Sequence, residues 1–382
     1  MQSSIDLFFS LIVSSISRKP IGTIDSRNCD FAWITYMAEH HDILQIIADG
    51  ALQNNLSDCF EGGETELKKA IFNASYRDSK NKHTFDLACE TLDKAGIEYM
   101  PLKGCLLKKM YPESWLRSSC DNDILVRRET LKTAAEVLQN VGFKVKGRLN
   151  YHDLSLLYDD TNLELHFSIR ENIKGMDVLL DEVWDNAERS VGFMYLQTND
   201  YFVFHHIAHM MHHFVVGGCG VRPFIDLWIL KRNNYYNDDV VKELCRRAQL
   251  YEFYCAVCET IQVWFEGKPS SEIVDTIREY IFYGGVYGNY PNNQAVNTVN
   301  SGGRIRNVIY SAFPRYENMC VLYPSLKKTP LLLPFCYINR FYIKLFGRDK
   351  KRVREKLISI KNQDNEFIKK IRYLFNELNL KK

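Results

Sequence analysis

The sequence lacks any apolar run of the roughly 18 residues that a membrane-spanning helix needs. Its nearest candidate is Leu331–Phe346, which Pro334, Arg340 and Lys344 interrupt. This excludes a transmembrane segment there and leaves a role at the membrane surface open. The first residues also lack the basic stretch of a signal peptide and include Asp6, so we expect no secretory signal.

Cysteine is present without the spacing of a disulfide framework or a zinc finger. The 11 cysteines are scattered through the chain, which favours a reducing compartment, and we expect a cytoplasmic protein. A single C-x-x-C pair, Cys255 and Cys258, has no second pair to complete a zinc site. The net charge of +2 indicates no class of partner, whereas 46% hydrophobic and 25% charged residues are typical of a globular protein.

What the sequence does contain is a pair of aspartates at the head of a strand. Asp121 and Asp123 lead into the apolar run Ile124–Val126, which has strand composition. Because strand side chains alternate, both aspartates share one face and Asn122 takes the other. Two carboxylates about 7 Å apart repel each other unless a cation lies between them. Mg²⁺ fits, because it takes oxygen ligands and keeps positions for substrate phosphates.

A third carboxylate comes from a strand predicted at Leu163–Ile169. Its apolar residues alternate with polar ones, so Glu164 and His166 lie side by side on the face away from the core. If the two strands are neighbours, Glu164 joins Asp121 and Asp123. Such a cluster suits two metal ions about 3.5–4 Å apart that support phosphoryl or nucleotidyl transfer.

A phosphate-binding turn is predicted upstream of the aspartates. Ile97–Met100 has the pattern of a short strand, and Lys103 and Gly104 then open a helix. Glycine at a helix start lets a phosphate approach unpaired backbone N–H groups. Lys103 and Arg117 add positive charge, and we place Ser118 beside them in the predicted nucleotide-binding set.

The order of these segments resembles a known pattern: L-K-G, then Y-P, then R-x-x-x-D-x-D-I-L-V, then L-E-L-H. It is similar to the bacterial "uncharacterised nucleotidyltransferase" family of the DNA polymerase β-like nucleotidyltransferase superfamily. Carried over, Lys103 and Gly104 match the turn, Asp121 and Asp123 the metal pair, and Glu164 the third carboxylate. The resemblance implies an NTP substrate, two Mg²⁺ ions and transfer of an NMP group to a hydroxyl of a small molecule, sugar, peptide or RNA end.

Two positions depart from that pattern. Lys103 precedes the glycine where much of the superfamily has Gly-Gly or Gly-Ser, and Asn122 stands where an apolar residue is usual. Neither change removes a carboxylate. They permit an alternative, a module on the same fold that binds an NTP or a partner without turnover.

A histidine-rich helix at Tyr201–Phe214 offers a different chemistry. His205, His209 and His212 are spaced i, i+4 and i+7, so they share one face. Histidines at i and i+4 can bind zinc with a third ligand, for which the C-x-x-C pair is a candidate. A zinc hydrolase built on residues His205–His213 is therefore an alternative. Without H-E-x-x-H, interior hydrogen bonding or a substrate cleft is the simpler interpretation.

The resemblance also implies a substrate cleft beyond the sheet. Its candidate residues are His166, His205 and His209, with Arg222 and Asp226 orienting substrate or bracing the cleft. A plain i, i+4 ion pair between Arg222 and Asp226 on one helix is an equally good interpretation.

We expect an α+β fold with a polymerase β-like core, a mixed sheet of about four or five strands with helices on one side. The predicted divisions are an N-terminal helical region at 1–80, the core at 81–171, a helical domain closing the cleft at 172–283, a Gly/Asn-rich loop at 284–303, and a C-terminal helical region at 304–382. The segment 348–382 has twelve Lys/Arg and five Asp/Glu. We predict that its helix packs one face, with nucleic-acid binding as the alternative; the oligomeric state stays open.

Overall fold

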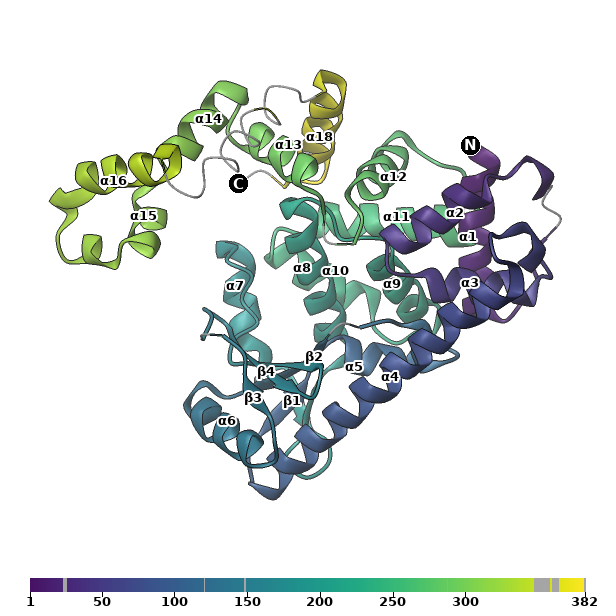
Figure 1. Ribbon diagram of the computed structural model, residues 1–382, viewed down its shortest axis with the longest axis horizontal. Helices are drawn as coiled ribbons and strands as arrows, with labels where there is room; N and C mark the ends of the chain where they lie inside the picture. Colours follow the sequence, from purple (N-terminus) through teal and green to yellow (C-terminus); the bar gives the residue numbers. More distant parts are fainter. Residues whose placement is uncertain are drawn as a thin grey trace. The chain divides into compact units, whose positions relative to one another are not determined.

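The computed structural model forms two compact units (Figure 1). One comprises Met1–His212 and Gly220–Val274, and the other comprises His213–Cys219 and Asp275–Lys382. The residues that the structure describes are 1–22, 26–119, 121–147, 149–286, 288–346, 358 and 364–380.

A five-stranded mixed sheet lies in the first unit. Its order is β1-β2-β5-β4-β3. The β2–β5 pair is parallel, and the other three pairs are antiparallel. The strands are β1 (Tyr99–Pro101), β2 (Asp121–Val126), β3 (Lys144–Val145), β4 (Asp153–Tyr158) and β5 (Thr161–His166). The predicted mixed sheet and α+β class are confirmed.

Two helices cover one face of this sheet, α4 (Gly63–Lys94) and α6 (Leu131–Asn140). The alternate apolar residues of β2 and β5 pack against them in one buried cluster with residues of both helices: Ile124, Val126, Leu163, Leu165, Ala88, Leu92, Ala134 and Leu138. Strand alternation then sends the intervening polar residues of β2 and β5 to the opposite face. The core therefore fixes which side of the sheet carries the acidic residues.

Helix α4 is one continuous helix of 32 residues (Figure 1). Apolar spacing alone predicts two shorter helices here, Thr65–Tyr76 with Thr65 as its N-cap and a second from about Phe85 to Ala95, and the structure shows one helix instead. The polar stretch between these two segments continues as helix because it contacts the protein interior, where Asn81 and Thr84 are buried. The expected boundary between residues 80 and 81 consequently falls inside α4.

Three helices precede α4: α1 (Gln2–Ser17), α2 (Phe31–His40) and α3 (Leu44–Gln53). The apolar positions of Phe31–Gly50 predict a single helix, but the structure has a break there between α2 and α3. Asp42 has a positive φ of 52° there, which ends helical geometry. The break places His41 in the interior and the Asp42 carboxylate near the sheet.

A hairpin and five α-helices follow the sheet in the described part of the first unit. Apolar spacing predicts a helix over Met176–Glu188, but the helix observed there ends at Leu180, and a β6–β7 hairpin that the spacing does not predict follows it. The elements are α7 (Lys174–Leu180), β6 (Ala187–Arg189), β7 (Tyr195–Gln197), α8 (Asn199–Val216), which leaves this unit after His212, α9 (Arg222–Arg232), α10 (Asp238–Arg247) and α11 (Tyr251–Glu266). A short helix, α5 (Gly104–Leu107), precedes β2.

The second unit is helical in its described part. Its helices are α12 (Glu272–Gly284), which starts in the first unit, then α13 (Tyr290–Asn300), α14 (Arg304–Ala312), α15 (Tyr316–Leu322), α16 (Leu333–Phe346) and α18 (Asn365–Glu377). Helix α18 buries one face, as predicted, through Ile368, Ile371, Leu374 and Phe375. Much of the predicted basic segment 348–382 lies outside the described residues. Across the described chain, no helix combines the length and apolarity that crossing a bilayer requires.

The Gly/Asn-rich stretch predicted as a loop contains helix α13, so that prediction was wrong for residues 290–300. Two of its asparagine side chains form hydrogen bonds that stabilise the helix and its packing, in place of turns. Asn289 caps α13 by accepting a hydrogen bond from the Asn292 amide. The Asn292 side chain donates to the carbonyls of Gly217 and Tyr280 in the same unit.

Candidate active site on the open face of the sheet

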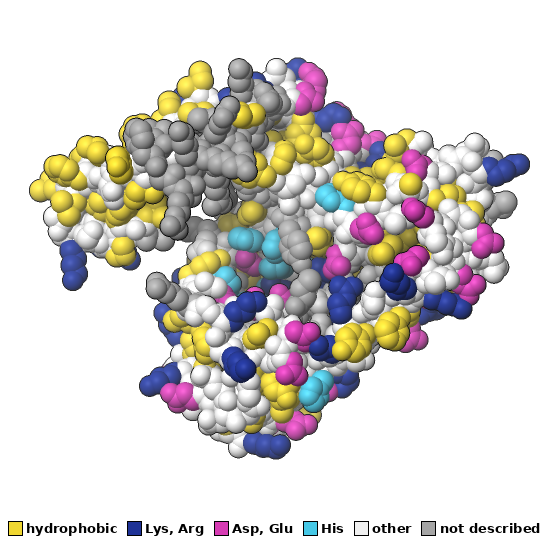
Figure 2. Space-filling view, in the orientation of Figure 1, with side chains coloured by type: hydrophobic (Ala, Val, Ile, Leu, Met, Phe, Trp, Pro, Cys, Tyr) yellow, Lys and Arg dark blue, Asp and Glu magenta, His cyan; other side chains and the backbone are white. Residues whose placement is uncertain are grey.

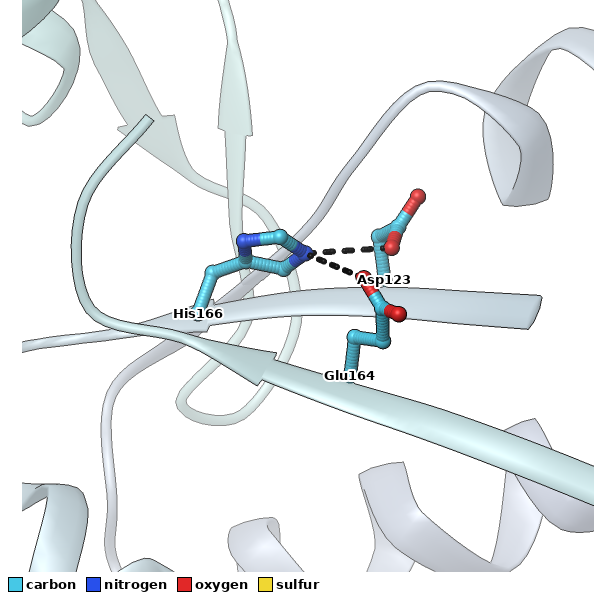
Figure 3. Close-up of side chains that lie close together, drawn as sticks. All are labelled: Asp123, Glu164 and His166. Carbon is cyan, nitrogen blue, oxygen red and sulfur yellow. Dashed lines mark hydrogen bonds and ion pairs between the residues drawn. The ribbon is translucent and has the colours of Figure 1, made fainter. Parts of the chain in front are cut away.

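Parallel pairing of β2 and β5 brings the acidic residues together. Asp123 is directly opposite Glu164 in the register, and Asp121 is opposite Asn162. Paired residues of parallel strands point to the same face, so Asp121, Asp123 and Glu164 share the side away from α4 and α6. His166 lies on this face too. Its Nε2 is 3.1 Å from Asp123 Oδ1 and 3.5 Å from Glu164 Oε2 (Figure 3).

The two aspartates differ in pKa because their surroundings differ. Burial, with the negative charges of Asp123 and Glu164, raises the pKa of Asp121 to about 6. Burial also acts to raise the pKa of Asp123, but the hydrogen bond from His166 outweighs it and the pKa falls to about 2. The charge of Asp123 is therefore held firmly, while Asp121 gains its charge only near neutral pH.

His166 carries the positive charge that balances this cluster. Burial acts to lower the pKa of His166, but its hydrogen bonds to Asp123 and Glu164 have the larger effect and raise the pKa to about 9. At neutral pH its imidazolium Nε2–H donates toward both carboxylates. Without a divalent cation, the cluster is thus held together by a proton on His166.

The donor set fits a divalent cation. One oxygen of Asp123, one oxygen of Glu164 and one nitrogen of His166 lie within 4.8 Å of one another. Carboxylate oxygens suit Mg²⁺ and Mn²⁺, and imidazole suits transition metals. Among the described residues this is the one such group of three, so the zinc site proposed for His205, His209 and His212 is not assembled.

The Lys103–Gly104 turn has the strain expected of a functional loop. Lys103 has φ 37° and ψ −100°, a region that favours glycine. A Cβ on Gly104 would lie 2.9 Å from Arg117 Nη1 and 3.2 Å from Ser119 Oγ. Any larger residue at this position would therefore displace the Arg117 or Ser119 side chain in the segment that leads into β2.

The Lys103 ammonium contacts helix α8. Its Nζ lies 2.8 Å from His209 Nδ1, and the same Nδ1 lies 2.7 Å from Glu171 Oε1. Glu171 Oε2 is also 3.3 Å from His212 Nδ1. The His209 Nδ1 atom can accept from Lys103 or donate to Glu171, but it cannot do both at once. Glu171 was not identified from the sequence. Its position a few residues after β5 is the one feature of the sequence that could have suggested it.

His205 lies in the protein interior. Its Nδ1 is 3.1 Å from Gln197 Nε2, and burial holds its pKa well below the ordinary value. It is a neutral histidine that packs beside the β6–β7 hairpin. Of the three histidines spaced along this helix, His209 and His212 are the two that face Glu171.

A buried ion pair ties the segment before β2 to helix α9. Arg117 Nε and Nη2 lie 3.2 and 3.0 Å from the two carboxylate oxygens of Asp226. The Tyr111 hydroxyl donates to the same carboxylate at 2.7 Å. Burial acts to raise the pKa of Asp226, but the Arg117 charge outweighs it, and the pKa lies below its ordinary value. A phosphate contact by Arg117 would have to compete with this pair.

A second polar cluster lies beside the first. Arg222 Nη1 is 3.0 Å from Asp42 Oδ2 and 2.8 Å from Ser118 Oγ. The Ser118 hydroxyl donates to Asp42 Oδ2 at 2.8 Å. The predicted pair between Arg222 and Asp226 was therefore wrong. Each residue has a closer partner from another part of the chain, so both brace the approach to β2.

Comparison with known proteins gives one result. The family model described as "Uncharacterised nucleotidyltransferase" matches residues 28–266. This range includes the five-stranded sheet, the Lys103 turn and the whole of helix α8. No significant match was found among curated proteins or among solved structures.

Proposed function

Because the chain belongs to the uncharacterised nucleotidyltransferase family, we propose that it transfers an NMP group from an NTP to a hydroxyl acceptor. The main support is the register that pairs Asp123 with Glu164 and sets Asp121 on the same face. Neighbouring strands hold the Asp123 and Glu164 carboxylates close together despite their repulsion, and Asp121 lies on the same face two residues before Asp123. Such an arrangement is typical of a cation site for phosphate chemistry.

In this proposal, Asp121, Asp123 and Glu164 hold the magnesium. When bound, Mg²⁺ supplies positive charge that offsets the charge developing on the triphosphate. Lys103 adds a further cation at the turn. Glu164 accepts the proton of the acceptor hydroxyl, whose oxygen forms a bond to the α-phosphorus. The bond between that phosphorus and the bridging oxygen breaks, and pyrophosphate leaves with the electron pair. The contribution of these residues is mostly positioning and electrostatic.

One observation favours the binding-only alternative. The two cations predicted for the triphosphate both have protein partners, since Lys103 contacts His209 and Arg117 pairs with Asp226. A chain that keeps these contacts with NTP bound would lack part of the charge that transfer requires. The two functions therefore differ in whether pyrophosphate appears.

The test is pyrophosphate release from labelled NTPs in the presence of Mg²⁺ and a panel of sugar, peptide and RNA acceptors. We expect release by the native chain and a loss of at least about 10³-fold in Asp123→Asn, because one of the carboxylates that would hold the magnesium is removed. Asp160→Asn is the matched control, since Asp160 is an exposed aspartate on the turn before β5. Equal release by Asp123→Asn and the native chain contradicts the proposal, and nucleotide binding without release supports the alternative.

A further inference from the structure

Helix α16 and the turn before it present an apolar stripe to solvent. Leu331, Phe335, Ile338 and Tyr342 have exposed fractions of 86%, 69%, 66% and 66%. Their spacing of four, three and four residues places them on one side of a helix. A row of four large apolar side chains that are each two-thirds exposed is unusual for a surface that faces only water.

The other side of the same helix is anchored. Cys336 belongs to a small buried cluster with Met319, Cys320 and Leu326. Arg340 Nη1 donates to the last carbonyls of α14, at 3.2 Å from Ser311 and 3.1 Å from Ala312. The exposed stripe is therefore the outer face of a packed element, and its direction is fixed by the contacts on the inner face.

Helix α14 extends this apolar face. Ile305, Ile309 and Phe313 are spaced four residues apart and are 78%, 49% and 50% exposed. The Phe313 ring lies 5.4 Å from the Tyr337 ring and 5.2 Å from the Phe341 ring of α16. In Figure 2, hydrophobic side chains crowd the part of the molecule that Figure 1 labels α14, α15 and α16.

The segment that carries this apolar face is rich in positive charge. Residues 304–346 contain seven Lys/Arg and a single acidic residue, Glu317, a net charge of +6 in a chain whose total is +2. Arg306, Arg315, Lys327 and Lys328 are exposed and form no ion pair with any residue in the described ranges. An occupant of this face must therefore be apolar at its centre and negative around it. A second copy of the chain would bring +6 against +6, which disfavours self-association.

We propose that the face formed by α14, α16 and the turn before α16 docks onto the surface of an anionic lipid bilayer. A helix of 14 residues is about 21 Å long, too short to cross the hydrocarbon core, so α16 lies in the plane of the interface. The stripe enters the boundary between headgroups and acyl chains, and the surrounding cations contact anionic headgroups. Burial of apolar area combined with this charge attraction is the physical basis of interfacial binding.

The test is co-sedimentation of the full-length chain with vesicles of phosphatidylcholine alone and of phosphatidylcholine mixed with phosphatidylglycerol. We expect binding to the mixed vesicles that weakens with salt, and little binding to the neutral ones. The double variant Phe335→Ser/Ile338→Ser should reduce partitioning by at least about tenfold, since each buried apolar side chain is worth about one order of magnitude or more. Lys327→Glu/Lys328→Glu should weaken binding to the mixed, anionic vesicles and leave the weak binding to the neutral vesicles unchanged.

Phe72→Ser/Tyr76→Ser provides the matched control, because these two α4 residues are 68% and 59% exposed and are also one helical turn apart. Its partitioning should equal that of the native chain. Circular dichroism and thermal unfolding of each variant separate lost binding from lost folding. Absence of binding to mixed vesicles overturns the proposal, as does equal binding by Phe335→Ser/Ile338→Ser. A native dimer that this variant converts to a monomer assigns the face to a second copy instead.

Discussion

Lys103 holds a backbone conformation that glycine adopts at much lower cost. A non-glycine residue in such a region costs about 1–3 kcal/mol and persists where surrounding structure enforces it. Here the side chain reaches His209, so the lysine keeps its ammonium next to the acidic face at the expense of stability. This explains in physical terms why the chain departs from the Gly-Gly turn common in the superfamily that it resembles.

Replacing Lys103 with glycine should stabilise the fold and impair transfer. We expect Lys103→Gly to raise the free energy of unfolding by about 1 kcal/mol and to lower kcat/KM for NTP by about tenfold or more, the loss of one charge-assisted hydrogen bond. Lys103→Ala is the matched control, because it removes the ammonium and keeps the strain. Urea unfolding and pyrophosphate release measure both effects. Equal stability of the glycine and alanine variants would disprove the strain argument.

The proton on His166 makes the stability of the metal-free protein depend on pH. Its pKa is about 9 in the folded chain and about 6.5 in the unfolded chain, so the folded state binds more protons between these values. The stabilisation is full below pH 6.5 and is lost as the pH rises through 9, with a magnitude on the order of 3 kcal/mol. Urea unfolding with a chelator present should show this decline in the native chain. In His166→Gln the same interval should be nearly flat, and an unchanged decline would refute the assignment.

At the scale of elements, Asn122 links strand β2 to two helices. Its side chain points to the helix-covered face, where Nδ2 donates to the Asn81 carbonyl of α4 at 3.1 Å and Oδ1 accepts from Cys105 of α5 at 3.7 Å. Asn81 in turn donates to the Ser119 carbonyl. This explains the unusual polar residue between the aspartates, because it fixes β2 against α4 from the side opposite the site.

Asn122→Val should weaken this strand–helix contact. The change removes both hydrogen bonds of the Asn122 side chain, to the Asn81 carbonyl and from Cys105, and at about 0.5–1.5 kcal/mol for each bond we expect a loss of about 1–3 kcal/mol in unfolding free energy. Ile124→Val, on the same face of β2, is the control for a small change in packing and should cost about 0.5–1.5 kcal/mol. Thermal and urea unfolding compare them. A valine variant as stable as the native chain would show that the asparagine contributes nothing to this packing.

Elements with a strong periodic pattern could be predicted from the sequence, and elements held by polar contacts could not. Alternation in β2 and β5 predicted both strands and the faces of Asp123 and Glu164. Helix α13 was missed because its asparagines act as a cap and as buried donors, which composition alone assigns to loops. Residue Glu171 lies outside any periodic element, so only the folded chain shows that it faces His209.

At the scale of the whole first unit, the Arg117–Asp226 pair connects the sheet to the helices that follow it. The partners are 109 residues apart, and both side chains are almost wholly buried. Burying one charge without the other is far more costly than burying the pair. The position of β2 relative to α9 therefore depends on both residues, although neither of them is a cation ligand in the proposed site.

Asp226→Ala should destabilise the protein by about 3–5 kcal/mol, because Arg117 is left buried without its counter-charge. The double variant Arg117→Met/Asp226→Leu should recover much of this loss, since no charge is then buried. Asp239→Asn, at an exposed aspartate, is the control and should be neutral. Urea unfolding gives all three values. If the double variant were less stable than Asp226→Ala, the pair would not behave as a coupled unit.

The parallel pairing of β2 with β5 has a consequence for biosynthesis. The aspartates are translated some forty residues before the glutamate and histidine that complete their surroundings, and α6, β3 and β4 lie between them. A nascent chain that ends before residue 164 therefore contains Asp121 and Asp123 without the partner strand that supplies Glu164 and His166. Under the proposed function, a ribosome-bound or truncated form of this kind would have an incomplete cation site and could not transfer a nucleotide.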